Sequence, residues 1–265
     1  MSTRALRTAA SGMYAQQLNI EVISNNIANI NTTGFKKNKA EFKDLMYQQV
    51  LVNPLSSATP GATEAVDTKI QVGNGVQPAS ALKIFKQGDV TSTGGQYDVA
   101  IKGDGFFQVK KADGTLAYTR DGSFQLAADG TLTTSSGYVL EPGITINEDA
   151  QSVTITKDGA VEVTTTGTNT TTVGNIQIAR FINPSGLLAL GDNLYAESVS
   201  SGKPIIGTPS STGFGELEQG FLESSNVDIV DEMVAMIQAQ RAYEINSKTV
   251  KTVEDMLTMA NNLKT

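Results

Sequence analysis

The side chains that most often carry out catalysis near neutral pH are missing from this chain of 265 residues, which contains no His and no Cys. Their absence removes imidazole bases, thiolate nucleophiles and the usual zinc ligands. The remaining candidate for chemistry is a carboxylate pair, Asp98 and Asp104, which would act on cell-wall sugars as a glycosidase does. No spacing or flanking motif supports that pair. We therefore predict no catalytic residues, no cofactor and no metal site, and a protein that is not an enzyme.

Asp-Gly pairs recur every eight residues, at Asp113-Gly114, Asp121-Gly122 and Asp129-Gly130. Repeated carboxylates can bind Ca²⁺, but calcium-binding β-rolls use longer, more Gly-rich repeats with more ligands in each turn. A single Asp in each repeat fits tight hairpin turns better. The repeat therefore predicts a β-meander and not a calcium site.

The net charge of the chain is −7 at pH 7. An acidic balance argues against a protein whose main work is to bind nucleic acid or an anionic membrane surface. No apolar run approaches the ~20 residues that a helix needs to cross a bilayer, and no cleavable signal is visible near the N-terminus. We expect no nucleic-acid partner, no membrane insertion and no ordinary secretory route.

A long amphipathic helix is predicted from about Thr3 to Ile30, because apolar residues recur three and four positions apart. The seam on this helix is formed by Leu6, Met13, Ile20, Ile23 and Ile27. Asparagines weaken its last turns, and Gly34 can stop a helix in the left-handed conformation. The lysines between Lys36 and Lys43 are interleaved with acidic residues, which favours a solvated or inter-subunit face for them.

A second long helix is predicted at the other end of the chain, from about Val227 to Leu263. Ser224, Ser225 and Asn226 are its candidate N-caps. Its apolar seam contains Met233, Val234, Ile237, Tyr243, Val250 and Leu257. Neither helix can bury its seam alone, so we expect the two to pair and another copy of the chain to cover what remains. The alternative is that both helices pack on the β-domain of the same molecule.

Between the helices the sequence predicts an arm and a β-domain. The segment from Phe42 to Val50 suggests a short helix, and Asn53–Ala65 has the Pro, Gly and small polar residues of a linker. From Lys69 onward, short alternating segments are separated by Gly and Asp-Gly, which is typical of strands. The predicted fold class is α+β, with terminal helices paired as a coiled-coil-like layer and a central all-β domain. The predicted domains are a helical assembly domain at 1–34 and 225–265, a connecting arm at 35–68 and an outer β-domain at 69–224.

Several strings in the chain resemble the bacterial flagellar rod and hook proteins. NNIANINTTGFK at Asn25–Lys36 is similar to the N-terminal signature of that family, and AASGM at Ala9–Met13 precedes it as it does there. Further similar strings are FKDLMY at 42–47, GFFQV at 105–109, AYTRDGSF at 117–124 and QRAYEINSK at 240–248. The resemblance covers nearly the whole chain, and it is strongest to the members that form the distal part of the rod.

The resemblance implies a structural subunit of the flagellar basal body that polymerises helically with copies of itself into the hollow distal rod across the periplasm. It implies export by the flagellar type III apparatus without signal cleavage, terminal helices that line the export channel, and other rod, hook and bushing-ring proteins as neighbours. The expected assembly motif is Asn25, Asn26, Asn29, Asn31, Thr33, Gly34, Phe35 and Lys36. Phe42 and Met46 resemble a short export-gate element, or else form an apolar i,i+4 pair on a helix.

Three alternatives remain open at this point. The nearest is a proximal rod or hook-type axial protein of the same family. The others are a cell-wall hydrolase that uses Asp98 and Asp104, and a surface adhesin built on the β-domain. Asp→Asn substitution would inactivate a hydrolase but leave a filament protein unaffected, and an isolated adhesin domain would keep its function without the helices.

Overall fold

The computed structural model describes residues 2–51, 69–147, 150–165 and 170–263 of the chain. The predicted linker Asn53–Ala65 lies outside the described residues. The chain divides into two compact units, each of which combines segments that are far apart in the sequence. Unit 1 comprises Met1–Asn25, Asn38–Leu82 and Val230–Thr265, and unit 2 comprises Asn26–Lys37 and Lys83–Ile229.

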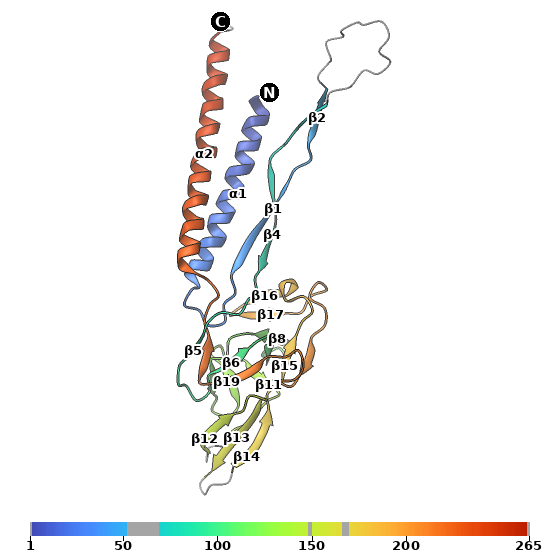
Figure 1. Ribbon diagram of the computed structural model, residues 1–265, viewed down its shortest axis with the longest axis vertical. Coiled ribbons are helices and arrows are strands. Elements are labelled where there is room, and N and C mark those ends of the chain that lie inside the picture. The colour runs from blue at the N-terminus through green and yellow to red at the C-terminus, as the bar shows by residue number, and fades with distance from the viewer. Residues whose placement is uncertain (1, 52–68, 148–149, 166–169, 264–265) are drawn as a thin grey trace, which may run out of the picture. The chain divides into compact units, whose positions relative to one another are not determined.

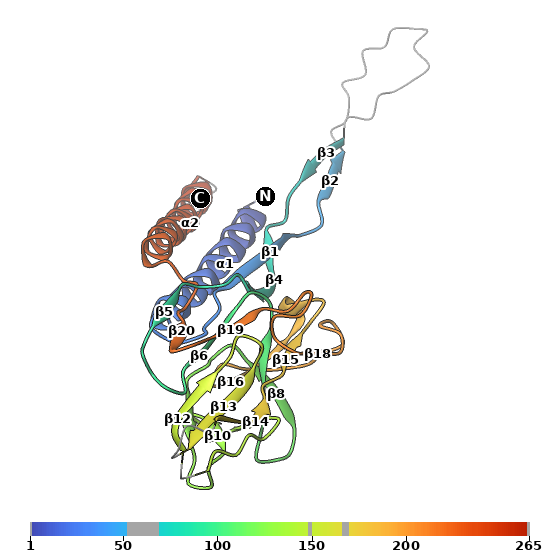
Figure 2. The same cartoon turned by 60° about the horizontal axis from the view of Figure 1, so that its bottom comes forward.

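Two long helices, α1 (Ser2–Ala28) and α2 (Ile229–Asn262), supply most of unit 1. Their bounds differ from the predicted ones by one or two residues at each end. The two helices run side by side (Figures 1 and 2). They approach closely at Gly12, where a methyl group in place of the hydrogen would lie 2.9 Å from Asn246 Nδ2. A larger side chain at position 12 would therefore displace the Asn246 amide.

Four strands complete unit 1 and correct the prediction for the arm. They are β1 (Asn38–Asp44), β2 (Gln48–Leu51), β3 (Lys69–Val72) and β4 (Val76–Lys83). β1 pairs with β4 and β2 pairs antiparallel with β3, so the two pairs form a long ribbon (Figure 1). The short helix predicted over Phe42–Val50 is wrong, because a helix of two or three turns is marginal alone whereas the partner strands satisfy the backbone groups. The same pairing places β3 and most of β4 in unit 1 and not in the predicted outer domain at 69–224.

Unit 2 is built from short strands. They are β5 (Val90–Ser92), β6 (Val99–Lys102), β7 (Phe106–Lys110), β8 (Leu116–Thr119), β9 (Phe124–Leu126), β10 (Leu132–Thr134), β11 (Val139–Glu141), β12 (Ala150–Ile155), β13 (Ala160–Thr165), β14 (Thr170–Asn175), β15 (Ile178–Arg180), β16 (Leu188–Gly191), β17 (Leu194–Ala196), β18 (Ile205–Gly207), β19 (Glu216–Gln219) and β20 (Phe221–Glu223). A 3₁₀ turn, Pro184–Gly186, precedes β16. The central all-β domain of the α+β prediction is thus confirmed.

The strands of unit 2 form one large sheet and three small ones, and every register determined is antiparallel. The large sheet has the order β16-β17-β8-β7-β11-β10-β9, with β15 paired to β7 and β18 paired to β15. The small sheets are β12-β13-β14, β19-β6 and β20-β5, several of which are visible in Figure 2. Short antiparallel strands joined by tight turns are the expected product of the Asp-Gly repeats.

The core of unit 2 lies on both faces of β7. Phe107 belongs to a large apolar cluster that draws on β6, β9, β10, β11, β12, β13 and β19, and its ring contacts Phe124 edge to face at 5.0 Å between centroids. Phe106, the next residue, joins a separate aromatic cluster with Tyr118, Phe181 and Tyr195. Successive side chains of a strand point to opposite faces, so this adjacent pair anchors two clusters at once.

The Asp-Gly repeats make turns, as predicted. Gly114 and Gly130 have positive φ, of 82° and 78°. The Asp113 and Asp129 carboxylates each accept hydrogen bonds from the backbone N–H and the hydroxyl of the Thr two residues later. These carboxylates are therefore engaged in Asx-type turns. Within the described residues, no group of three or more acidic side chains is placed to hold a metal ion.

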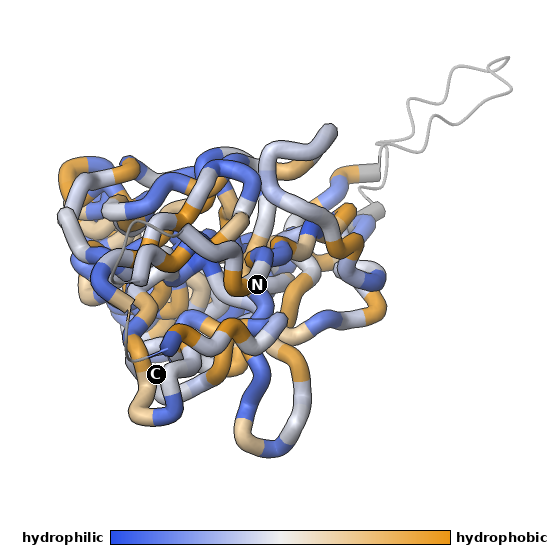
Figure 3. The backbone as a smooth tube through the Cα atoms, turned by 90° about the horizontal axis from the view of Figure 1, so that it is seen from below, coloured by the Kyte–Doolittle hydropathy of each residue, from blue (hydrophilic) through white to orange (hydrophobic). Residues whose placement is uncertain are grey.

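Apolar positions along the chain occur in short stretches interrupted by polar ones, as Figure 3 shows for the described residues. Neither helix is both long enough and apolar enough to cross a membrane over the part of the chain that the structure describes.

Replacing Leu132 by Ala is predicted to lower the free energy of unfolding of unit 2 by about 2–5 kcal/mol, because the side chain is 1% exposed inside the large cluster. Leu126→Ala is the matched control. Leu126 is the register partner of Leu132 on the neighbouring strand but is 40% exposed, so we expect less than half that loss. Urea unfolding of the two variants measures both values, and equal losses would contradict the assignment of the core.

Candidate assembly site

The assembly motif predicted from the sequence makes a sharp turn at Gly34, within unit 2. Gly34 has a φ of +67°, and its N–H donates to the Glu223 carbonyl at 2.8 Å. A methyl group on Gly34 would lie 2.7 Å from the Asp121 N and 2.8 Å from the Arg120 carbonyl carbon. The position therefore requires glycine twice, for its backbone conformation and for the space.

Three charged side chains meet inside unit 2 directly beyond this turn: Lys36, Arg120 and Glu223, which are 0%, 3% and 1% exposed. We call them the buried triad. Lys36 Nζ is ion-paired and hydrogen-bonded to Glu223 Oε1, and Arg120 Nη1 lies 3.3 Å from Glu223 Oε2. Burial lowers the pKa of Lys36, and the Glu223 carboxylate opposes that shift. One carboxylate thus holds two buried cations.

Backbone groups satisfy further donors and acceptors of the triad, although the buried Arg120 Nε has no hydrogen-bond partner among the described residues. Lys36 Nζ donates to the Lys86 carbonyl at 2.9 Å, and Arg120 Nη2 donates to the Gly103 carbonyl at 2.8 Å. Glu223 Oε1 also accepts the Gly88 N–H at 2.9 Å. A buried ion pair is tolerated only when such additional hydrogen bonds satisfy its remaining donors and acceptors. The interpretation of Lys36 as part of a solvated or inter-subunit face is therefore wrong.

Asn226 ties the segment after α1 to the segment before α2. Its Oδ1 accepts the Lys37 N–H at 2.7 Å, and its Nδ2 donates to the Ile84 and Lys86 carbonyls at 2.8 and 2.9 Å. The side chain is thus engaged away from the helix. Because α2 begins at Ile229, the prediction of Ser224, Ser225 or Asn226 as its N-cap is wrong.

The other residues of the motif lie in several environments. Asn26 is 1% exposed in unit 2, whereas Asn31 is exposed. Thr32 Oγ1 donates to Asn29 Oδ1 at 3.2 Å, the Thr33 carbonyl accepts from Asn193 Nδ2 at 3.0 Å, and Phe35 is buried. In unit 1, Asn38 Nδ2 lies 3.4 Å from Asn25 Oδ1. The motif therefore does structural work inside one chain at Gly34, Phe35 and Lys36, and a role of its asparagines between copies stays a prediction.

Arg120, Glu223 and Asn226 were not among the predicted site residues. No spacing rule pairs Glu223 with Lys36, because 187 positions separate them in the chain. The available signal is that Lys36 and Arg120 both stand inside strings that resemble the flagellar family. That signal marks their importance but says nothing of their contact.

The helix α2 turns a small and polar face inward. Its buried side chains are Glu232, Ala239 and Val253, and Asn246, which approaches Gly12, completes this set at intervals of seven residues. A seven-residue interval returns to nearly the same side of an α-helix. We call Glu232, Ala239, Asn246 and Val253 the inner face of α2.

Large apolar side chains lie on a different side of α2. We define its outer stripe as Val230, Met233, Val234 and Ile237, which are 65%, 53%, 49% and 50% exposed. At about 100° per residue, these positions lie about 120–180° around the helix from Ala239. The outer stripe therefore points away from the inner face and is left uncovered in the single chain.

The predicted helix seams are only partly buried. Ile23 of α1 is 5% exposed, whereas Leu6, Met13, Ile20 and Ile27 are half-buried. On α2, Met233, Val234, Ile237, Tyr243 and Leu257 are all at least 39% exposed, and Val250 is half-buried. A coiled-coil-like seam between the terminal helices is therefore a proposal for the assembled state.

Phe42 and Met46, the expected export-gate element, lie on the ribbon of unit 1. Phe42 belongs to β1 and is 37% exposed, and Met46 follows that strand and is 88% exposed. The alternative of an i,i+4 pair on a helix is wrong, because this segment is extended. Both side chains are accessible, so a role in export stays a prediction.

The carboxylates of the hydrolase alternative are engaged separately. The Asp98 carboxylate accepts a hydrogen bond from the Thr93 hydroxyl. Asp104 lines a cavity of about 340 Å³ together with Arg120, Arg180 and three Phe side chains, and Asp98 is not among the described residues of that lining. The structure does not bring the two carboxylates together around a common cavity.

Replacing Gly34 by Ala is predicted to destabilise unit 2 by about 2 kcal/mol or more, because the new side chain must hold a positive φ against crowding by Arg120 and Asp121. Gly114→Ala is the matched control, since Gly114 also has positive φ but nothing within 4 Å of an added methyl group. We expect a loss of about 1 kcal/mol there. Chemical unfolding measures the difference, and equal losses would show that the crowding has no energetic effect.

Removing the carboxylate of the buried triad is predicted to cost more than removing one cation. Glu223→Gln leaves Lys36 and Arg120 buried without a counter-charge. It should lower the free energy of unfolding by about 3–5 kcal/mol. Lys36→Met should lower the free energy of unfolding by less, because Glu223 remains ion-paired with Arg120. Urea unfolding measures both, and the reverse order would contradict the shared role of Glu223.

The pH dependence of stability gives a second measurement on Lys36. Its pKa is lowered in the folded chain, so between that lowered value and 10.5 the unfolded chain binds more protons at this residue. Stability must therefore rise with pH through that window. We expect Lys36→Met to remove this contribution, and an unchanged pH profile in the variant would contradict it.

Comparison with known proteins relates the motif and both helices to one family. Three family models match: "Flagella basal body rod protein" over residues 6–36, "Flagellar hook protein FlgE/F/G D1 domain" over residues 100–163, and "Flagellar basal body rod FlgEFG protein C-terminal" over residues 218–263. The first contains most of α1 and the whole assembly motif, Asn25–Lys36. The third contains Glu223, Asn226 and all of α2.

Relatives match along nearly the whole chain. The flagellar basal-body rod protein FlgG of Borreliella burgdorferi is 51% identical over 98% of this chain and 98% of its own length. Those of Caulobacter vibrioides and Bacillus subtilis are 48% and 42% identical, each over 98% of this chain and 99% of the relative. The flagellar basal-body rod protein FlgF of Caulobacter vibrioides is 34% identical over 95% of this chain and 94% of its own length.

These matches confirm the resemblance that the motif strings indicate, including the stronger similarity to the distal type of rod protein. They extend across both helices and the β-domain, so they account for the whole architecture and not for one motif. The chain belongs to the flagellar basal-body rod protein family.

Proposed function

We propose that this chain is a structural subunit of the flagellar distal rod and that its copies polymerise helically into a hollow shaft in the basal body. Family membership across nearly the full length supports this proposal. A proximal rod protein is less well supported, because identity to the FlgF relative is lower than identity to the FlgG relatives.

The observation that carries the proposal is the outer stripe of α2. Its four large apolar side chains are 49–65% exposed in a chain that packs Ala239 and Asn246 inward instead. Covering the exposed half of each side chain would contribute about 1–2 kcal/mol. A second copy can supply that cover, and a contact between different surfaces, repeated along an axis, makes a filament and not a closed ring.

The terminal helices would form the inner tube of the shaft, paired as a coiled-coil-like layer, with the β-domain outside. The small residues at the approach of Gly12 to Asn246 support close pairing, and the exposed seam residues support further packing between copies. The predicted domains, with assembly segments at 1–34 and 225–265 and an outer domain at 69–224, belong to this proposal. β3 and most of β4 belong to unit 1, together with the two helices.

Several partners follow from this role. They are copies of the chain itself, other rod proteins, the hook, the bushing ring and the flagellar type III export apparatus. The exposed positions of Phe42 and Met46 are compatible with contact to the export gate. We propose a structural role and no catalysis, which agrees with the separate engagement of Asp98 and Asp104.

Two Asp substitutions in the outer stripe test the proposal. Val234→Asp with Ile237→Asp should abolish polymerisation, because assembly would bury two carboxylates without partners. The unfolding midpoint of unit 2 should stay at the wild-type value. Electron microscopy of the purified protein reports filaments, and Gln125→Asp with Gln151→Asp, at exposed positions of unit 2, is the control for added charge. Wild-type filaments from the stripe variant would contradict the proposal, as would filaments from a chain that lacks residues 1–30.

A further inference from the structure

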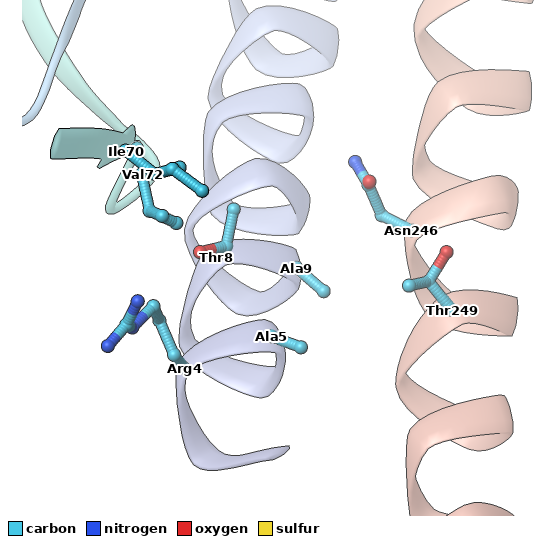
Figure 4. Close-up of a pocket in the computed structure, with 9 residues that line it drawn as sticks. Arg4, Ala5, Thr8, Ala9, Ile70, Val72, Asn246 and Thr249 are labelled. Atoms are coloured by element: carbon cyan, nitrogen blue, oxygen red, sulfur yellow. The ribbon is translucent and has the colours of Figure 1, made fainter. Parts of the chain in front are cut away.

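A slot opens in unit 1 between the N-terminal half of α1, the C-terminal half of α2 and β3. It has a volume of about 590 Å³ and is lined by Arg4, Ala5, Thr8, Ala9, Ile70, Val72, Gly73, Asn246 and Thr249. Figure 4 shows Ala5 and Ala9 pointing from α1 toward α2, with Asn246 and Thr249 pointing back. Small side chains leave this space unfilled, while Ile70 is 50% exposed at its edge.

We propose that the slot is the acceptor for the outer stripe of a second copy of this chain. The inference rests on the proposed function and deepens it, because it states which two surfaces meet when copies assemble. The acceptor is a slot with small residues on α1, Ala5, Thr8 and Ala9, and with Ile70 and Val72 on β3. The donor, Val230, Met233, Val234 and Ile237, is a row of large apolar side chains on one side of a helix. The two surfaces are complementary in size.

The charges beside the two surfaces are complementary as well. Arg4 lines the slot, and Arg7 is exposed one helical turn further along α1. Asp231, which is exposed, flanks the outer stripe. Opposite charges beside an apolar contact steer association and fix its register. A second copy therefore fits the slot in both shape and charge.

One chain cannot fill its own slot with its own stripe. Met233 and Thr249 are sixteen residues apart on the straight course of α2, which is about 24 Å along the helix axis. The contact must join two copies, and because donor and acceptor are different surfaces, each copy keeps one of each for further neighbours. Such a contact extends without closing, as a shaft requires.

Disulfide trapping tests this contact, and the absence of native Cys makes the readout clean. Thr8→Cys would be placed in a tagged chain and Ile237→Cys in an untagged chain, and the two would be copolymerised and oxidised. We expect mixed disulfide dimers, because Cα atoms in a disulfide lie within about 7 Å. Gln238→Cys replaces Ile237→Cys in the control, since Gln238 is exposed about 100° further around the helix. The yield of mixed disulfide in the control should be at least about tenfold lower, because a side chain turned away rarely meets its partner.

The possible outcomes separate this inference from the proposed function. Filaments without a mixed disulfide above the control would overturn the slot-to-stripe contact and leave the structural role intact. Disulfide dimers of the Ile237→Cys chain alone would also overturn it, because they indicate a stripe-to-stripe contact. No filaments from the wild-type chain would instead contradict the proposed function.

A charge reversal gives an independent readout. Arg4→Glu should slow polymerisation by about tenfold, and adding Asp231→Lys should restore the rate to near the wild-type value. The unfolding midpoint should be unchanged in both variants, which separates assembly from folding. Slowing without rescue would show that Arg4 and Asp231 do not face one another across the contact.

Discussion

The buried triad is the interaction on which the rest of unit 2 depends. Glu223 accepts from Lys36 and from Arg120, and all three side chains are almost completely withdrawn from water. Charges so placed are destabilising unless every one of them is paired, so the three must assemble together or not at all. Lys36 belongs to the segment that follows α1, and Glu223 ends the strand that precedes α2. Within unit 2, the triad therefore joins the segment that follows α1 to the end of β20.

Gly34 and Asn226 reinforce this junction with backbone hydrogen bonds. The N–H of Gly34 donates to the Glu223 carbonyl, and Asn226 joins Lys37 to the strand connection at Ile84 and Lys86. Removing the Asn226 amide would take these hydrogen bonds from three backbone groups at once. Within unit 2, these hydrogen bonds join the segment at 34–37 to the segment at 223–226.

Unit 1 has the opposite character, because much of its apolar surface lies uncovered. The inner face of α2 is made of Glu232, Ala239, Asn246 and Val253, which allows a close approach to α1 at Gly12 but buries little apolar area. The larger side chains of the outer stripe remain exposed. The two units therefore differ in how far each covers its apolar side chains within a single chain.

The sequence by itself determined the two terminal helices, the all-β centre, the Asp-Gly turns and the family. These rest on local signals: apolar spacing along a helix, turn residues with positive φ, and continuous motif strings. Only the tertiary structure decided that Lys36 is buried against Glu223, that the segment at 42–50 pairs as strands, and which side of α2 faces inward. The physical reason is that each of these depends on partners far away in the chain. The sequence around Lys36 is typical of a surface residue, because nothing local shows that Glu223 and Arg120 contact it. An amphipathic helix with apolar residues on two faces does not specify which face its neighbour will cover.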